Sequence, residues 1–326
     1  ILTCIWSVVS MYAWDRNILV STKNTSLLFA AQNDGDLRFA YYGDKITPDQ
    51  INQIHDIWAG LNRPAYPTFG SEYSSATALQ VVHSDGNMTL DLIVKDVTTK
   101  NVENGEQTVV TLRDKHYPFE MIPLKYPLTS FSDFLDFQTL SIHYNQIYKG
   151  YIDELNKNLQ DLKNLQTLSL DEILFNENLI PTTKRTKTIH AASGAYNHQI
   201  IFESMTPNPI VQISPKLKMA IEKKYQSLNN FYQEFKKACL NLNGCGFVFL
   251  VCDKDGKVAI EQVLGNKTTV KANLCPIFGI DMFEHAYYLK YKNDKKTYVE
   301  QWLKYICFEY ANNEYEECLK AIELNK

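Results

Sequence analysis

The sequence predicts two domains: an all-β domain that forms part of an antiparallel sandwich, followed by an α+β domain. The chain has 326 residues, enough for two domains of ordinary size. Residues 15–120 contain short apolar runs separated by turn residues, whereas after Ser130 apolar residues recur every three or four positions. The change of period near residues 118–125 therefore marks the boundary between β structure and helical structure.

The predicted β domain spans residues 15–120. Its strands are short runs rich in Val, Ile, Leu and aromatic residues, several of them alternating with polar residues. Turn sequences such as Asn-Asp-Gly and Ser-Asp-Gly separate these runs. The runs that predict strands lie at 18–22, 26–30, 37–42, 78–83, 88–94 and 108–112. One short helix is expected over 46–58, and the small number of strands predicts a partial sandwich with exposed edges.

The second domain is predicted to begin with a helical part, residues 121–208, and to end with an α/β part, residues 209–326. Apolar residues at spacings of three and four predict the helices, and β-branched runs predict three antiparallel strands. The sequence Asp-Lys-Asp-Gly at 253–256 predicts a hairpin turn between the first two strands. The predicted helices cover 131–165, 187–205, 215–240, 296–309 and 312–324, and the predicted strands cover 247–252, 258–263 and 268–272.

Composition limits the partners of this chain and leaves its compartment open. The net charge of −4 gives no basis for binding to nucleic acid or to an anionic membrane surface. Seven cysteines without C-x-x-C spacing predict free, mostly buried thiols, which favours a cytoplasmic or mitochondrial compartment. The apolar residues 1–14 are either a signal-peptide remnant, which would indicate secretion, or a buried strand or a fragment of upstream sequence.

The run from Gly279 to Tyr288 carries the clearest chemical signal. Asp281 and His285 lie four positions apart, so one helical turn or a tight loop would direct both side chains to one spot. Mixed imidazole and carboxylate ligands suit iron or manganese better than a metal that prefers thiolates. Such a pair is half a site, and His143 and His198 are the upstream candidates for the other half. Any one of these histidines alone is more often an ordinary polar residue than a ligand.

These segments together resemble the iron/manganese superoxide dismutase family. The order His143, His198, Asp281-x-x-x-His285 matches that family, and Asp-x-x-Glu-His-Ala-Tyr-Tyr is its most specific motif here. The resemblance covers about residues 120–320. It implies a helical hairpin followed by a three-stranded antiparallel sheet with helices, one Fe or Mn ion per chain held by these four residues, and dismutation of superoxide to dioxygen and hydrogen peroxide.

The resemblance also implies roles for three further residues. Tyr151, about two helical turns after His143, corresponds to the phenol at the substrate gate. Glu284 corresponds to the residue that reaches the metal-binding histidine of a partner subunit, and Tyr288 to a residue of the same interface. The family pattern therefore implies a homodimer formed through the C-terminal domain.

The sequence departs from the family pattern around the site. Ile147 stands where the family often has a histidine, and His190 stands where it commonly has asparagine. The glutamine beside the metal is missing from both usual positions: Gly194 occupies one and Gly265 falls near the other. The nearest glutamine, Gln262, fits only if the alignment shifts by three residues. These departures put the rate and the choice of metal in doubt.

The β domain resembles a different family, the N-terminal β-domain of family-36 α-galactosidases. The segments that carry this resemblance are 21–26, 41–44, 62–70 and 83–92. The barrel that holds the two catalytic carboxylates of that family is absent, so no galactosidase activity is expected.

Three alternatives to an active dismutase remain open from the sequence. The dismutase-type fold could be a catalytically weak or inactive structural module, as in the related subunits of mitochondrial ribosomes. The β domain could bind carbohydrate through Trp14, Trp58, Tyr66 and the loop 62–70, although core packing is the commoner role for such aromatic residues. The abrupt change near residues 118–125 is also typical of two genes joined by a mistaken gene model, which peptide mapping across the junction would test.

Overall fold

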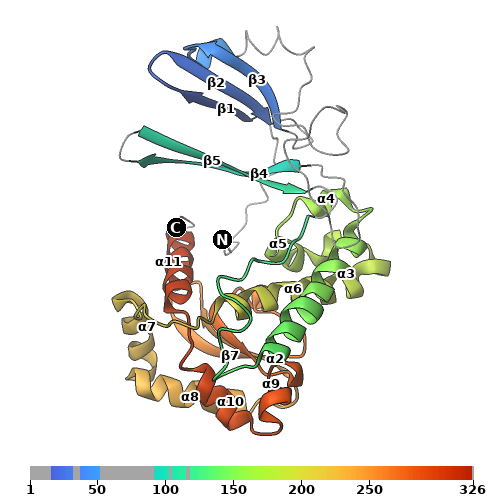
Figure 1. Ribbon diagram of the computed structural model, residues 1–326, viewed down its shortest axis with the longest axis vertical. Coiled ribbons are helices and arrows are strands. Elements are labelled where there is room, and N and C mark those ends of the chain that lie inside the picture. Colours follow the sequence, from blue (N-terminus) through green and yellow to red (C-terminus); the bar gives the residue numbers. More distant parts are fainter. Residues whose placement is uncertain (1–15, 32–36, 52–91, 103–104, 115–117, 325–326) are drawn as a thin grey trace. The chain divides into compact units, whose positions relative to one another are not determined.

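The computed structural model describes residues 16–31, 37–51, 92–102, 105–114 and 118–324 (Figure 1). The chain divides into two compact units, one formed by residues 8–119 and the other mainly by residues 120–326. The predicted strand at 78–83, most of the predicted helix at 46–58 and the segment 1–14 lie outside the described residues. Within the described residues no helix is long and apolar enough to cross a membrane.

The N-terminal unit contains antiparallel β structure, as the sequence predicts. Strands β1 (Arg16–Ser21), β2 (Thr25–Ala31) and β3 (Leu37–Asp44) form one sheet in that order, and β4 (Leu92–Val102) pairs with β5 (Gly105–Asp114) in a hairpin. A small core joins the two sheets, because Val94 packs with Ile18 and Leu37. The described part of the predicted helix contains one 3₁₀ turn, η1 (Pro48–Gln50).

The C-terminal unit begins with a helical hairpin. Its first arm consists of α2 (Phe137–Ile142), a π-helical turn η2 (His143–Tyr148) and α3 (Lys149–Leu159), and its second arm is α6 (Thr182–Glu203), which packs against α3 (Figure 1). The first helix starts later than predicted because the Asp136 side chain accepts a hydrogen bond from the Thr139 amide and caps it. The connection between the arms contains α4 (Lys163–Gln166), α5 (Leu170–Phe175) and η3 (Glu177–Leu179).

A three-stranded antiparallel sheet follows, with β6 (Gly246–Cys252) between β7 (Val258–Leu264) and β8 (Cys275–Asp281). The prediction of a third strand at 268–272 was wrong, since Val270–Ala272 form a 3₁₀ turn, η4, that ends at Asn273 in the left-handed region. All seven residues of β8 are buried. A fully buried strand shows no alternation, which explains why the pattern missed it.

Helices α7 to α11 lie in the same part of the chain as this sheet, and the prediction of one helix over 215–240 was also wrong. Gln226 has a φ of 65°, which ends α7 (Pro215–Tyr225), and Ser227 caps the start of α8 (Leu228–Leu240). The remaining helices are α9 (Glu284–Tyr291), α10 (Lys295–Trp302) and α11 (Phe308–Leu324). No helix was predicted over the range of α9, α10 ends earlier than the prediction of 296–309, and α11 begins earlier than the prediction of 312–324. Helix α8 covers β6 and β7, while α6 and α11 contact β8, so the core lies between the sheet and the helices.

Most of the cysteines in the described part of the chain lie outside disulfides. Cys239, Cys245, Cys252 and Cys307 are outside disulfides, whereas Cys275 is disulfide-bonded. The expectation that the thiols are free was therefore wrong for Cys275.

Candidate metal centre

Four side chains from four separate elements converge in the C-terminal unit. His143 begins the π-helical turn η2, His198 lies in α6, Asp281 ends β8, and His285 lies in the first turn of α9. One ligand atom from each of these residues lies within 4.8 Å of all the others. The structure thus brings together the four residues that the sequence predicted for a metal site.

Backbone contacts fix the carboxylate at the centre of this cluster. Asp281 is fully buried; its Oδ1 accepts a hydrogen bond of 2.7 Å from the Phe283 amide, and its carbonyl oxygen accepts one of 2.9 Å from the Tyr298 hydroxyl. Its Oδ2 faces the imidazoles, at 3.1 Å from Nε2 of His285, 3.2 Å from Nε2 of His143 and 3.8 Å from Nε2 of His198. One carboxylate oxygen therefore faces three ring nitrogens.

The orientation of His198 is set by its own helix. Its Nδ1 lies 2.8 Å from the carbonyl oxygen of Gly194, one turn earlier in α6. Because a carbonyl can only accept, we assign the proton to Nδ1, which leaves the lone pair on Nε2 pointing into the cluster. The backbone here has the role that carboxylates or carbonyls commonly have behind metal-bound histidines.

Two buried ring nitrogens lack a hydrogen-bond partner among the described residues. These are Nε2 of His143 and Nε2 of His198, on side chains that are 2% and 1% exposed. A buried polar atom without a partner is costly in free energy. Both nitrogens face Asp281 Oδ2, so the cluster fits a metal cation coordinated by nitrogen and oxygen.

The electrostatics of the cluster favour the ligand forms of His143, His198 and Asp281, and the protonated form of His285 in the metal-free protein. Burial lowers the pKa of His143, and burial together with the neighbouring His143 lowers the pKa of His198 to about 3, so both rings are neutral near pH 7. Burial alone would raise the pKa of Asp281, but His285 and His143 together hold it well below its usual range. Burial would lower the pKa of His285, yet Asp281 raises it.

The metal-free protein should lose stability on acidification. His198 has a pKa of about 3 in the folded protein, against about 6.5 when unfolded, so between these values the unfolded state binds more protons. The free energy of unfolding should fall by up to about 1.4 kcal/mol per pH unit for each such histidine. His285 contributes with the opposite sign, because its raised pKa adds stability at low pH that is lost as pH rises through its folded pKa.

Urea unfolding of the metal-free protein at pH 7 and pH 5, followed by helical circular dichroism, measures this effect. The urea midpoint should be lower at pH 5, and His198→Gln should show a smaller difference between the two pH values. Equal urea midpoints at the two pH values for the natural sequence would show that buried neutral histidines do not dominate the pH dependence of the free energy of unfolding.

Tyr151 lies beside His198, one of the four converging residues. Its ring centroid is 5.2 Å from that of His198 and 5.7 Å from that of the exposed His190. Burial, and next the nearby Asp281, raise the pKa of the Tyr151 phenol, so it is protonated at neutral pH. The Tyr151 ring packs directly against Gly194. A Cβ added at Gly194 would lie only 2.2 Å from Tyr151 Cδ1.

Gly194→Ala should therefore displace Tyr151 and destabilise the helical hairpin by about 1–3 kcal/mol through overpacking. Gly150→Ala is the matched control, because a Cβ at that glycine of α3 meets nothing within 4 Å. It should be neutral or stabilise the protein by about 0.5–1 kcal/mol. Thermal unfolding of both variants tests the contact, and equal midpoints would show that the ring does not need the glycine.

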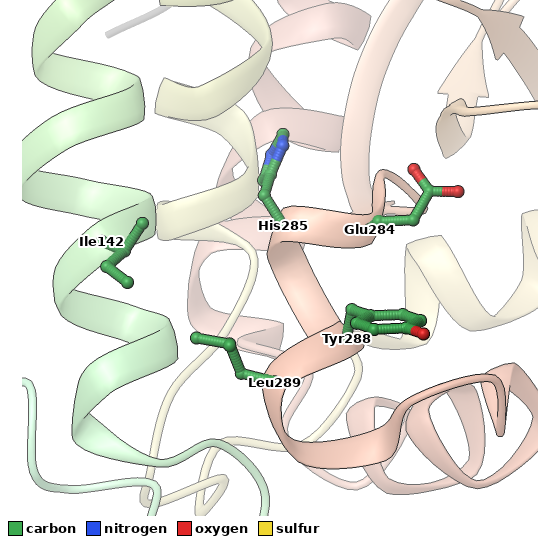
Figure 2. Close-up of a pocket in the computed structure, with 5 residues that line it drawn as sticks. All are labelled: Ile142, Glu284, His285, Tyr288 and Leu289. Carbon is green, nitrogen blue, oxygen red and sulfur yellow. The ribbon is translucent and has the colours of Figure 1, made fainter.

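Glu284 and Tyr288 lie apart from the four converging atoms. They line a surface pocket with Ile142, His285 and Leu289, where α9 faces α2 (Figure 2). In Figure 2 the Leu289 side chain points toward Ile142, while Glu284 and Tyr288 lie together on the other side of α9. His285 is the one member of the cluster that borders this pocket.

Gln262 does not occupy the glutamine position beside the cluster. Its side chain is exposed, and its Nε2 donates a hydrogen bond of 2.6 Å to the carbonyl oxygen of Ala238 in α8. The three-residue alignment shift that would place it at the site is therefore wrong. The ring of Phe283 stacks on His285 at 5.3 Å, and the ring of Phe247 lies 6.0 Å from His198, so phenylalanines form this wall of the site.

Sequence reasoning missed three aromatic neighbours of the cluster: Tyr148, Phe202 and Tyr298. Tyr148 stacks on His198 at 6.0 Å, and Phe202 lies 5.0 Å from His143. Phe202 follows His198 by four residues in a predicted helix, and this spacing could have predicted that the two side chains lie on the same face. Tyr148 follows His143 by five residues, and an α-helical period gives no indication of the π-helical turn that contains both.

The C-terminal unit is a helical hairpin joined to a three-stranded sheet, and three imidazoles and one carboxylate converge between them. These features place the protein in the class of metal-binding proteins with a histidine and carboxylate site. Family comparison then identifies the family. Residues 118–206 match the α-hairpin domain of iron/manganese superoxide dismutases, and residues 213–314 match the C-terminal domain of the same family. The chain belongs to the iron/manganese superoxide dismutase family.

Similar curated proteins carry both metal names. The chain is 30% identical over 202 residues to superoxide dismutase [Mn] 1 of Leptolyngbya boryana, which covers 61% of this chain and 82% of that protein. It is 27% identical over 208 residues to superoxide dismutase [Mn] 2 of Bacillus anthracis, covering 64% and 98% of the two chains. It is 28% identical over 198 residues to superoxide dismutase [Fe] of Plasmodium falciparum, covering 60% and 96%.

Proposed function

We propose that the C-terminal unit is a superoxide dismutase with one iron or manganese ion per chain, held by His143, His198, His285 and Asp281. The observation that carries this proposal is the convergence of four ligand atoms within 4.8 Å, two of them buried Nε2 atoms that have no hydrogen-bond partner in the described part of the chain. The reaction converts two superoxide anions and two protons into dioxygen and hydrogen peroxide. When bound, the ion would supply the one-electron couple that this disproportionation requires.

The protein residues have separate tasks in this proposal. Three neutral imidazoles and one carboxylate bind the cation and keep the net charge of the site small. The Gly194 carbonyl and the Phe283 amide orient two of the ligands. Tyr151 keeps its proton because of burial and the negative charge of Asp281, so the phenol can donate a hydrogen bond or a proton to an anion that enters beside it.

Removal and restoration of the metal test this proposal. The purified protein is treated with a chelator, divided, and reconstituted with iron, manganese or zinc before an assay of superoxide consumption. Activity that returns with iron or manganese, and not with redox-inactive zinc, is expected. Equal superoxide consumption by the chelated and reconstituted samples would refute the proposal.

The homodimer is part of the same proposal, with Glu284 and Tyr288 at the interface. Its support is the exposed apolar surface at the pocket of Figure 2, where Tyr288 and Leu289 are 51% and 43% exposed. Light scattering should give twice the 37.6 kDa chain mass, and Leu289→Glu should give the mass of one chain. A natural protein that has the mass of a single chain would contradict this assignment.

A catalytically weak or inactive structural module is the second candidate. The observation that favours it is the position of Gln262, which leaves the cluster without the glutamine that the family pattern places beside the metal-bound solvent. A protein with full metal content and no dismutase activity would support this alternative. The same sample with strong activity would remove it.

The N-terminal unit remains a proposed relative of the β-domain of family-36 α-galactosidases, without galactosidase activity. Antiparallel strands β1–β3 and the hairpin β4–β5 are consistent with such a domain. Trp14, Trp58 and Tyr66, the candidates for a sugar platform, lie outside the described residues. A glycan array probed with the full chain would test carbohydrate association, and the absence of any bound glycan would count against it.

A further inference from the structure

Two cysteines that are distant in the sequence contact each other in the C-terminal unit. Cys252 is the last residue of β6, and Cys318 lies in the middle of α11. Their side chains are hydrogen-bonded to each other, and the residues are only 1% and 3% exposed. The pair is separate from the metal centre, since Asp281 pairs with Phe247 at the opposite end of β6.

Contacts that involve no sulfur hold α11 against this end of the sheet. The Tyr315 hydroxyl donates a hydrogen bond of 3.0 Å to the carbonyl oxygen of Gly256, in the turn that follows β6. A Cβ at Gly256 would lie 3.0 Å from Leu319 Cδ2, so the helix and the turn are in close contact. Tyr315, Cys318 and Leu319 share one face of the helix because they are spaced by three and four residues. The two sulfur atoms are therefore placed by the packing around them.

The other nearby cysteine is already engaged. Cys275 of β8 is the cross-strand partner of Cys252, and it is disulfide-bonded. Cys275 is therefore not available to Cys252, whereas Cys318 is in contact with it.

We propose that Cys252 and Cys318 are a disulfide-forming pair that links α11 to β6 when the chain folds in the presence of a low-molecular-weight disulfide. In the first step one cysteine thiolate attacks the small disulfide, breaks its S–S bond and releases one small thiolate. In the second step the other cysteine thiolate attacks the mixed disulfide, forms the S–S bond within the protein and releases the second small thiolate. The two cysteines are oxidised by two electrons in total, and the small disulfide is reduced to two thiols.

Burial determines when this exchange occurs. Contact with Cys252 and burial raise the pKa of the Cys318 thiol, and the thiolate is the form that reacts. Exchange is therefore slow once α11 has docked and proceeds during folding, before the helix covers the sheet. The same burial then protects the finished disulfide from reductants. The oxidation state of the pair therefore depends on the redox conditions in which the chain folded.

Refolding of the full chain tests the proposal independently of dismutase activity. The denatured, reduced protein is refolded either with reduced and oxidised glutathione or with a phosphine reductant. Remaining thiols are alkylated under denaturing conditions, and the peptides are mapped by mass spectrometry. The glutathione sample should contain a Cys252–Cys318 linked peptide, and its thermal midpoint should be higher on the order of 5–10 °C.

Serine variants separate this link from other cysteine chemistry. Cys318→Ser and Cys252→Ser should each remove the linked peptide and the gain in thermal midpoint, whereas Cys239→Ser, which changes a buried thiol in α8, should preserve both. Alkylation of both Cys252 and Cys318 after refolding with glutathione would overturn the proposal. A link from Cys252 to any other cysteine would also overturn it, and the peptide map of the natural sequence decides the matter even if a variant does not fold.

Discussion

His198→Ala is expected to abolish metal retention and dismutase activity while the helical content stays unchanged. His198 is 1% exposed, and its Nε2 faces the cluster with no hydrogen-bond partner among the residues that the structure describes. Loss of residues that merely support a ligand weakens metal binding by about 10–100-fold, so loss of a ligand itself should cost more than about 100-fold. Metal analysis after dialysis, the superoxide assay and circular dichroism measure the three expected results.

His190→Ala is the matched control, because it removes an exposed imidazole from the same face of α6, two turns away. It should retain the metal ion. Full metal content and activity in His198→Ala would contradict the site assignment, and loss of metal in both variants would show only that α6 tolerates no substitution.

Asp281→Asn is expected to have an effect of similar size for a different reason. The carboxylate is the single negative charge among three imidazoles and lies within 3.8 Å of all three Nε2 atoms. Asparagine has nearly the same shape, and its oxygen can still accept the hydrogen bond from the Phe283 amide, so the local fold should persist. The neutral amide cannot offset the charge of a divalent or trivalent cation, and metal affinity should fall by more than about 100-fold.

Asp253→Asn provides the comparison, since Asp253 also follows a strand and accepts backbone hydrogen bonds, in the turn after β6. This variant should keep its metal. An Asp281→Asn protein that binds metal as tightly as the natural sequence would show that the carboxylate is not a ligand.

The candidate site could be predicted more completely than the fold because its chemistry is carried by residue types. Asp281 and His285 stand four positions apart in the sequence. This spacing brings the two side chains together in a continuous helix and also in the observed arrangement, where Asp281 ends β8 and His285 lies in the first turn of α9. Helical spacing predicted Tyr151 on nearly the same face as His143, but a π-helical turn begins at His143, and in the structure both Tyr148 and Tyr151 contact His198.

The errors in the fold prediction have physical causes that periodicity does not report. Strand β8 is buried on both faces and lacks alternation, so the weaker β-branched run at 268–272 was taken as the strand. The division of the helix at 215–240 depends on one residue, Gln226, in a left-handed conformation that is rare for glutamine. The direction of the Gln262 side chain depends on its pairing opposite Val248, a tertiary feature.

Metal content and dismutase activity, measured on the same purified sample, test the central claim most directly. The account predicts about one iron or manganese ion per chain, together with superoxide consumption that scales with that content across preparations. A protein that stays metal-free after reconstitution with either ion, and that consumes no superoxide, would contradict it.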